Sequence, residues 1–435
     1  MKDTSAKPNA LALLPFLVFA AFYVGLSVWA NDFYKVPMVI AFLVASAVSV
    51  ALNRRKPLAE KIDMYSFGMG ETNIMMMCLI FILAGAFATV AKGAGAVDAA
   101  VTIAQSLVPA KLMVAGVFLV SCLISLAIGT SCGTIAAVTP IALGFAGPLH
   151  LNPALLMGAV IGGSMFGDNL SMISDTTIAA TRTQGVLMKD KFMANFFIAL
   201  PAAALALALY AVTGMAEGSV GPVPDVTWRD LLLVSPYLLV LVFALAGFNV
   251  MALLFNGTVL AALVGGFLGK FDFFGALDLI GKGTLGMSET LIVAILAGGL
   301  FRSVQTNGGV AWLTEKISRL IRGPKTCEFG VFLLVSTVNC FTANNTVAIV
   351  IAGPIARECA QRFGANPVRV ASVLDTASCV VQGLIPYGAQ ILIAVGVAKG
   401  LDMTVDSLAL LKYLYYQPLL ALAVFVTMLV GRKAH

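Results

Sequence analysis

Residues 162–177 read GGSMFGDNLSMISDTT, and these sixteen residues constrain the architecture of the chain more than any others. Apolar segments flank it, so its glycines, hydroxyls and two aspartates interrupt what would otherwise be one long apolar helix. An ionised carboxylate at the centre of a bilayer costs about 2.5–3.5 kcal/mol on insertion scales, so Asp168 and Asp175 must face protein or a water-filled cavity. The stretch therefore predicts a helix that is unwound at membrane depth.

The composition of the chain indicates that lipid is its main solvent. Of its 435 residues, 60% are apolar and 11% are charged, whereas soluble domains carry roughly 25% charged residues. So few charges cannot cover a water-exposed surface, which excludes a soluble enzyme, a nucleic-acid-binding protein and a disordered chain. The net charge of +6 does not indicate nucleic acid, because the basic residues cluster between apolar segments. We expect membrane lipid as a partner.

The cysteines and histidines indicate neither a disulfide framework nor a metal cofactor. The 7 cysteines lie almost wholly in apolar segments and lack CxxC or Cys/His spacing. A membrane enzyme would need a nucleophile with a base, or a metal, and the two histidines, His150 and His435, lie outside the apolar segments. We therefore expect no cofactor and no enzymatic activity.

Apolar segments of spanning length predict an all-α polytopic membrane protein. A transmembrane helix needs about 20 apolar residues. Two further apolar regions, near 111–180 and 326–398, are interrupted too often by Gly, Pro, Ser, Thr and Asn to be plain spans. We expect about ten transmembrane helices and two re-entrant hairpins. The uninterrupted segments begin at about Leu11, Val36, Thr72, Phe192, Leu231, Met251, Thr290 and Leu408.

The lysines and arginines predict the orientation. Most of the 27 fall on one side of the membrane, Lys191 among them, if both hairpins enter and leave on the same face. Both termini are then cytoplasmic, and the acidic segment 217–230 is extracytoplasmic. We expect a multi-pass protein of the inner (plasma) membrane.

An internal repeat divides the chain into two halves. Pro140-Ile141-Ala142 recurs as Pro354-Ile355-Ala356, and Asn152-Pro153 recurs as Asn366-Pro367, with an offset of 213–215 over most of each half. Each half has an odd number of spans, so the second must be inverted, an architecture typical of secondary transporters. The predicted boundaries are 1–213 for the first repeat, 214–228 for an extracytoplasmic linker and 229–435 for the second repeat. The hairpins occupy about 111–147 and 325–361, and the broken helices about 153–180 and 367–398.

Each half contributes a polar hairpin turn and an interrupted helix to a predicted site at the midplane. The turns are GTSCGT at 129–134 and TANNT at 342–346, and the second interrupted helix carries DTASC at 375–379. Hydroxyl, amide and carboxylate oxygens suit a hard cation such as Na⁺. The candidate cation- and proton-binding residues are Thr130, Ser131, Thr134, Asp168, Asn169, Ser171, Ser174, Asp175, Thr176, Asn344, Asn345, Thr346, Asp375, Thr376 and Ser378.

Several acids also have a structural interpretation. Glu71 and Glu289 lie at helix starts, where first-turn acids complement the helix dipole. Asp375, inside a helix, can simply accept a hydrogen bond from a neighbouring hydroxyl. Asp168 and Asp175 lie among glycines and hydroxyls, which favours a role in ion binding. In a continuous helix, their spacing of seven would put them on one face.

The residues 129–134 and 166–177 resemble the NhaC-type sodium/proton antiporter family, part of the wider ion transporter superfamily. The resemblance implies a dimer, an elevator-like motion, and hairpins and unwound helices that enclose the ion. Asp168 and Asp175 fall on the acidic positions of the family. Cys132 and Met172 stand where the family usually has Trp and Pro, which alters the cavity.

Our hypothesis is Na⁺/H⁺ antiport by alternating access, with Na⁺ at Asp168, Asp175 and Asn345 and no resident cofactor. The alternative is Na⁺- or H⁺-coupled transport of an organic acid or amino acid, for which a buried Arg or Lys would be the expected counter-charge. None lies in the turn motifs, which favours ion exchange. A channel would need a continuous polar pore, which interrupted helices in inverted halves do not predict.

Overall fold

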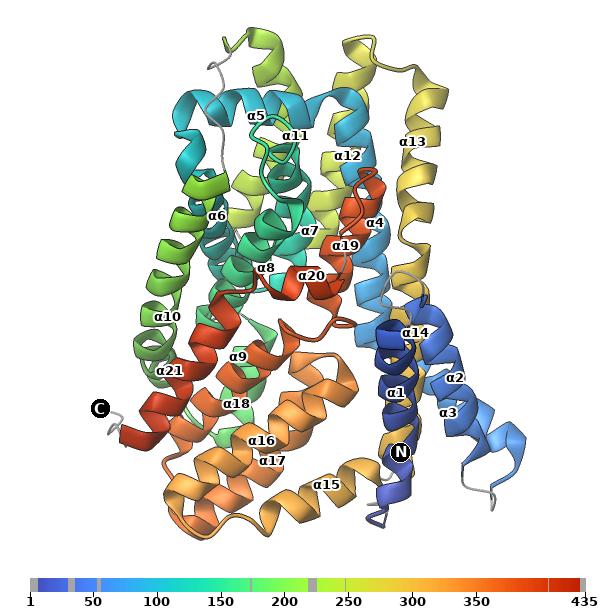
Figure 1. Cartoon of the computed structure of the whole chain (residues 1–435), viewed down its shortest axis with the longest axis vertical. Coiled ribbons are helices and arrows are strands. Elements are labelled where there is room, and N and C mark those ends of the chain that lie inside the picture. Colours follow the sequence, from blue (N-terminus) through green and yellow to red (C-terminus); the bar gives the residue numbers. More distant parts are fainter. Residues whose placement is uncertain are drawn as a thin grey trace.

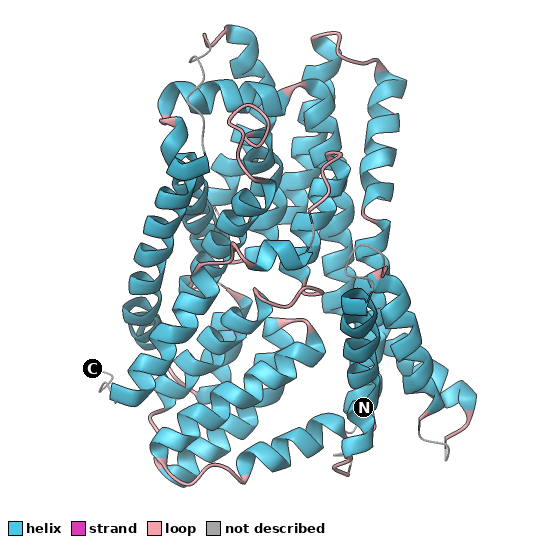
Figure 2. Cartoon of the chain, in the orientation of Figure 1, coloured by secondary structure: helices cyan, strands magenta, loops and turns pink. Residues whose placement is uncertain are grey.

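The computed structural model describes residues 7–29, 36–52, 56–172, 174–217, 225–246, 248–405 and 407–430. Over these ranges the regular secondary structure is helical, without strands (Figure 2). The all-α prediction is therefore confirmed for the described part of the chain.

The first half of the chain forms ten α-helices and two short 3-10 helices in its described residues. They are η1 (Ala10–Leu13), α1 (Leu14–Trp29), α2 (Met38–Ala51), α3 (Leu58–Met69), α4 (Thr72–Ala94), α5 (Ala96–Leu107), η3 (Ala110–Leu112), α6 (Met113–Ile128), α7 (Ser131–Gly144), α8 (Pro153–Leu170), α9 (Asp175–Gln184) and α10 (Met188–Glu217).

The second half forms eleven α-helices in its described residues. They are α11 (Trp228–Leu245), α12 (Val250–Phe267), α13 (Phe273–Gly286), α14 (Ser288–Thr306), α15 (Gly309–Ser318), α16 (Pro324–Thr342), α17 (Asn345–Phe363), α18 (Pro367–Gln382), α19 (Ala389–Gly400), α20 (Ser407–Leu411) and α21 (Tyr416–Val430).

Several of these helices are apolar enough to cross a bilayer. In the described residues, 5 stretches have the required length and composition: Thr72–Ala94, Ala110–Ile128, Met188–Ala216, Val250–Phe267 and Phe273–Thr306. Six shorter apolar helices accompany them. The chain is thus a membrane protein with several apolar helices.

The helix boundaries differ from expectation at three places. The sequence predicts no membrane span at α3, because the charged residues Glu60, Lys61 and Asp63 interrupt its apolar residues. It also does not predict α13 before the span near Thr290. Of the predicted linker 214–228, residues 214–217 belong to the last turn of α10, and residues 218–224 lie outside the described part of the chain.

Two helix–turn–helix units occupy the predicted hairpin positions. Gly129 joins α6 to the turn before α7 with φ +74°, and Ala343 joins α16 to the turn before α17 with φ +47°. Both values lie in the left-handed region, which favours glycine, so Ala343 is held there against its intrinsic preference. Figure 1 places α6 and α7 in the upper half of the molecule and α16 and α17 in the lower half.

Two helices are interrupted within the predicted stretches, but the first interruption is shorter than the predicted 162–177, because residues 162–170 continue α8 and Asp168 lies in its last turn. The first interruption separates α8, which ends at Leu170, from α9, which begins at Asp175. The second separates α18, which ends at Gln382, from α19, which begins at Ala389. Each broken helix begins with an Asn-Pro pair, and Asn152 and Asn366 both cap their helices by accepting hydrogen bonds from backbone N–H groups.

Small residues bring α8 into close contact with α6. A Cβ added at Gly163 would clash with the backbone carbonyl of Phe118, and one added at Gly167 would clash with the backbone nitrogen of Leu126. Glycines spaced by four let helix backbones approach closely in membrane proteins. This contact fixes α8, and with it the helix end that carries Asp168.

We predict that Gly163→Ala destabilises the protein by about 1–3 kcal/mol, because the new methyl group must displace backbone of α6. Gly116→Ala on α6 is the matched control, since a Cβ there meets nothing within 4 Å. It should be neutral or gain up to about 1 kcal/mol of helix propensity. Thermal unfolding in detergent measures both, and equal Tm values for the two variants would contradict the packing argument.

Candidate ion-binding site

Asp168 lies where α7, α17 and the break after α8 meet. Its side chain is buried, with 4% exposed. Its Oδ2 accepts hydrogen bonds from Ser131 Oγ at 2.8 Å and from Asn345 Nδ2 at 3.4 Å. Its Oδ1 accepts one from Ser174 Oγ at 2.5 Å. Residues from both halves of the chain therefore hold one carboxylate.

Helix N-termini add partial positive charge around this carboxylate. Ser131 is the first residue of α7, Asn345 the first of α17, and Ser174 the N-cap of α9. The free N–H groups at a helix start favour a nearby anion. The hydroxyl donors and the three helix starts together lower the cost of burying an ionised Asp168, but they supply no full positive charge.

A cavity of about 130 Å³ opens beside Asp168. Most of the residues that line it are polar, and they come from both hairpin turns, the α8–α9 break and the start of α19. They include Asn73, Gly129, Thr130, Ser131, Cys132, Asp168, Ser174, Asp175, Thr176, Asn344, Asn345, Thr346, Gln382 and Gln390, with Met76, Met77 and Ile80 on one side. The cavity has room for a small ion with little water.

Two glutamines connect Asp168 to the turn of the second hairpin. Gln390 Nε2 donates to Ser131 Oγ at 3.0 Å, and Gln382 Nε2 donates to Gln390 Oε1 at 2.8 Å and to the carbonyl of Ala343 at 2.7 Å. The last of these hydrogen bonds links Ala343, whose backbone is in the left-handed region, to the same network. Sequence reasoning did not assign either glutamine to the site, although a glutamine within an apolar segment is a usable signal.

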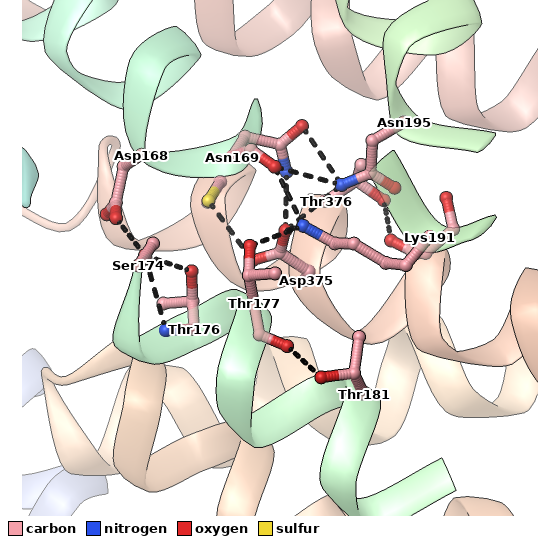
Figure 3. A network of polar contacts seen from close by, with 12 residues as sticks. Asp168, Asn169, Ser174, Thr176, Thr177, Thr181, Lys191, Asn195, Asp375 and Thr376 are labelled. Atoms are coloured by element: carbon pink, nitrogen blue, oxygen red, sulfur yellow. Dashed lines mark hydrogen bonds and ion pairs between the residues drawn. The ribbon is translucent and has the colours of Figure 1, made fainter. Parts of the chain in front are cut away.

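Asp375 belongs to a second buried cluster beside the first (Figure 3). Its Oδ2 accepts hydrogen bonds from Asn169 Nδ2 at 3.2 Å and Asn195 Nδ2 at 3.0 Å, and it forms an ion pair with Lys191. Asn169 follows Asp168 directly in the chain, so the two clusters share the end of α8. Asp375 does not line the cavity, which corrects its predicted place in the opposite wall.

Lys191 counts as one of the basic residues of the cytoplasmic side in the sequence, and the structure shows that its side chain is buried. Its side chain is 1% exposed. Lys191 and Asn195 are four residues apart on α10, so they share the helix face that packs on α18 and α9. Two polar residues four positions apart at the start of an apolar segment indicate a polar helix face. A count of charges on each side of the membrane does not reveal this face.

The structure brings most of the predicted residues together, but not all. The cavity is lined by Thr130, Ser131, Asp168, Ser174, Asp175, Thr176, Asn344, Asn345 and Thr346. Four predicted hydroxyl ligands lie outside its walls: Thr134, Ser171, Thr376 and Ser378. In three of these residues the hydroxyl donates a hydrogen bond to a backbone carbonyl one turn earlier in the chain. Thr134 donates to Thr130, Thr376 to Ser372 and Ser378 to Asp375.

Asp175 and Asn345 line the cavity in ways that the sequence did not indicate. Asp175 has an exposed side chain and begins α9, so the break removes the shared helix face expected from its spacing to Asp168. The amide nitrogen of Asn345 donates a hydrogen bond to Asp168, while its Oδ1 accepts a hydrogen bond from the N–H of Thr346 at 3.1 Å. In this arrangement Asn345 supports the carboxylate through its amide nitrogen, and the second lone pair of its Oδ1 can still be offered to a cation in the cavity.

Two broken helices and two hairpin turns thus converge on buried ionisable groups. This arrangement defines a membrane protein of the secondary-transporter class. The comparison with known families gives the particular assignment: the profile of the Na⁺/H⁺ antiporter family matches residues 7–215 and 227–431. The chain belongs to the Na⁺/H⁺ antiporter family, a family of transporters, and the resemblance seen in the sequence is confirmed.

Relatives differ in the substrates that their names state. The chain is 23% identical to the Na⁺/H⁺ antiporter NhaC of Alkalihalophilus pseudofirmus over 433 residues, covering 91% of this chain and 89% of that protein. It is 25% identical to the malate-2H⁺/Na⁺-lactate antiporter of Bacillus subtilis, over 50% of this chain and 46% of that protein. It is 24% identical to the arginine/ornithine antiporter ArcD of Halobacterium salinarum, over 73% of this chain and 71% of that protein.

We predict that Gln390→Met destabilises the protein by about 1–3 kcal/mol, because buried partners in the glutamine chain lose hydrogen bonds. Gln417→Met is the control, since both side-chain polar atoms of this buried glutamine on α21 lack a hydrogen-bond partner. The Gln417→Met substitution should be neutral or stabilising. Thermal unfolding in detergent measures the Tm of both variants, and a lower Tm for Gln417→Met than for Gln390→Met would refute the proposed role of the glutamine hydrogen bonds.

Proposed function

We propose that this protein exchanges Na⁺ for H⁺ across the membrane, with Asp168 as the carboxylate that both ions share. One observation carries the proposal. Among the described residues, Asp168 is a buried carboxylate without a lysine or arginine within ion-pair distance, and it lines a cavity of about 130 Å³. A buried anion without a fixed counter-charge requires a mobile one, either a cation or a proton.

The exchange follows from competition for one charge. When Na⁺ binds the Asp168 carboxylate, the proton held there must leave, and when a proton returns, Na⁺ loses its charged ligand. The hydroxyls of Ser131, Ser174 and Thr176 can rotate, so each can donate to the carboxylate or turn an oxygen lone pair toward a cation. The proton-loaded and sodium-loaded sites carry the same net charge, which allows both to cross while the empty site does not.

The cavity volume favours an ion over an organic substrate. Sites for drug-sized molecules usually measure about 300–1,000 Å³, and the cavity at Asp168 measures about 130 Å³. The cavity therefore suits the ion exchange named for several relatives better than the transport of a molecule as large as arginine.

A neighbouring cavity supports the alternative, transport of a small carboxylate or amino acid. It measures about 460 Å³ and shares Asn73 and Thr346 with the ion cavity. Arg302, Gln305 and Glu71 also line it. The guanidinium of Arg302 hydrogen-bonds Gln305 at 3.3 Å and stacks over Phe67, and no ion pair to a carboxylate engages it among the described residues. This arginine is the counter-charge that an organic anion would need.

The two halves have matching parts, which supports inverted repeats at 1–213 and 229–435 and alternating access between them. Gly95 before α5 and Gly308 before α15 both have φ +88° and are 213 positions apart. Asn152 and Asn366 cap the two broken helices in the same way. The hairpins lie in opposite halves of the molecule (Figure 1), and their turns meet at the ion cavity.

The proposal includes a plasma-membrane location with cytoplasmic termini. The start of α1 and the end of α21 lie in the same half of the molecule (Figure 1), as they must if both termini are on the cytoplasmic side. The homodimer that the family resemblance implies stays a prediction. The mass of the detergent-solubilised protein, measured by light scattering, tests it.

We predict that Asp168→Asn abolishes Na⁺-dependent proton flux, because the amide can neither release a proton nor neutralise Na⁺. A pH-sensitive dye inside proteoliposomes follows the flux on addition of Na⁺. Asp402→Asn is the control, because this carboxylate is exposed and pairs with Lys92 away from the site. Flux that persists in Asp168→Asn, or the lack of flux in the wild type, would rule out the proposal.

We predict that Na⁺ raises the Tm of the purified protein and that malate, lactate and arginine do not, because a ligand stabilises the state that binds it. Uptake of radiolabelled acids and amino acids into proteoliposomes provides the second measurement. Na⁺-dependent uptake that Arg302→Gln removes would favour the alternative and contradict the present choice. The same variant should leave Na⁺/H⁺ exchange within about twofold of the wild type, since Arg302 lies outside the ion cavity.

A further inference from the structure

The ammonium group of Lys191 is surrounded by oxygens. It donates hydrogen bonds to the backbone carbonyl of Asn169 at 2.8 Å and to Thr177 Oγ1 at 2.7 Å, and it forms the ion pair with Asp375. An ammonium has three donors, and these three acceptors satisfy them. Figure 3 shows the lysine reaching this cluster from α10.

These acceptors come from three different elements. Asn169 lies in the last turn of α8, where the break leaves its carbonyl without an intrahelical partner. Thr177 lies in the first turn of α9, and Asp375 in the middle of α18. One further oxygen in the cluster, Oδ1 of Asn195, is buried and accepts no hydrogen bond. The chain thus gathers a carboxylate, a hydroxyl and a freed carbonyl around one positive charge.

This donor set is the chemistry of a monovalent metal-cation site. Freed carbonyls at broken helices, hydroxyls and carboxylates are the groups that bind Na⁺ in transporters, and hard cations prefer oxygen ligands. The Asp168 cavity next to it offers similar groups but contains no basic side chain in its walls. The two clusters therefore differ chiefly in whether the protein itself supplies the cation.

We propose that Lys191 is a tethered cation that permanently fills a second monovalent-cation site, formed by Asn169, Thr177 and Asp375. The lysine keeps Asp375 ionised and paired, so this carboxylate takes no part in holding the transported ion. One exchangeable site, at Asp168, remains. This last consequence rests on the proposed function, whereas the second site itself does not.

The charge balance predicts that replacement of Lys191 by a neutral residue destabilises the protein. The side chains of Lys191 and Asp375 are 1% and 0% exposed. Removal of one partner of a buried pair leaves an uncompensated charge, which is strongly destabilising. Removal of the lysine side chain also leaves space in front of the three oxygens, and a free cation can enter that space.

The test is rescue of the purified Lys191→Ala variant by added cations. In choline chloride, whose cation is too large for the vacated space, the variant should have a lower Tm than the wild type. Propylammonium chloride, whose cation replaces the missing ammonium fragment, should restore most of the lost Tm. Sodium chloride should raise the Tm of the variant by more than it raises the Tm of the wild type, which Na⁺ stabilises only through the Asp168 site. The wild type should show no response to propylammonium.

The matched control is the double variant Lys191→Ala/Asp375→Asn. It lacks the carboxylate, so it should be more stable than Lys191→Ala in choline and should lose the response to propylammonium. Lys399→Ala, which removes a partly exposed lysine paired with Glu289, should show no response to propylammonium and the same response to Na⁺ as the wild type. Rescue that is absent in Lys191→Ala, or equal in the double variant, would overturn the proposal.

The result is separable from the proposed exchange. The Tm measurements need no transport, so a wild type without Na⁺-dependent proton flux would refute the exchange and leave the tethered-cation site open to its own test. If both hold, equilibrium ²²Na⁺ binding should increase from one ion per chain in the wild type to two in Lys191→Ala. An unchanged number would contradict the assignment of the vacated oxygens to a cation site.

Discussion

The cost of placing a carboxylate in an apolar interior governs this structure. Two buried aspartates, Asp168 and Asp375, lie near one another at the centre of a lipid-embedded chain, and each needs compensation. The helix breaks, the hairpin turns and the polar residues of α10 all supply hydrogen-bond donors or positive charge to these two groups. The polar interior of the protein is therefore organised around two anions.

The two aspartates are compensated in different ways. Asp375 has a covalently attached counter-charge in Lys191, with two asparagine amides beside it. Asp168 has hydroxyl and amide donors and three helix N-termini, but no basic side chain among the described residues. A fixed counter-charge gives a structural anchor, whereas its absence leaves a carboxylate that can take a mobile ion. This difference assigns distinct roles to acids that look alike in the sequence.

Sequence reasoning located the local features of the site well. The predicted hairpin turns at Gly129 and Ala343 and the break before Asp175 depend on nearby residues, and all three occur. Ser131 and Ser174 were assigned to the same site as Asp168, and both donate to it. The partners that were missed, Lys191, Asn195 and Gln390, lie on helices whose apolar composition and terminal position suggested spans or surface charge.

The lipid environment, the helical class, the turns and the breaks can be predicted without a structure, because these follow from composition and from short-range preferences of Gly, Pro and Asn. Which polar side chains meet depends on how the helices pack. Lys191 and Asp375 are 184 positions apart, and nothing local sets their contact. The reason is physical: a helix face points wherever packing turns it, so the partner of a buried charge depends on how whole helices pack, as with α8 held against α6 by its glycines.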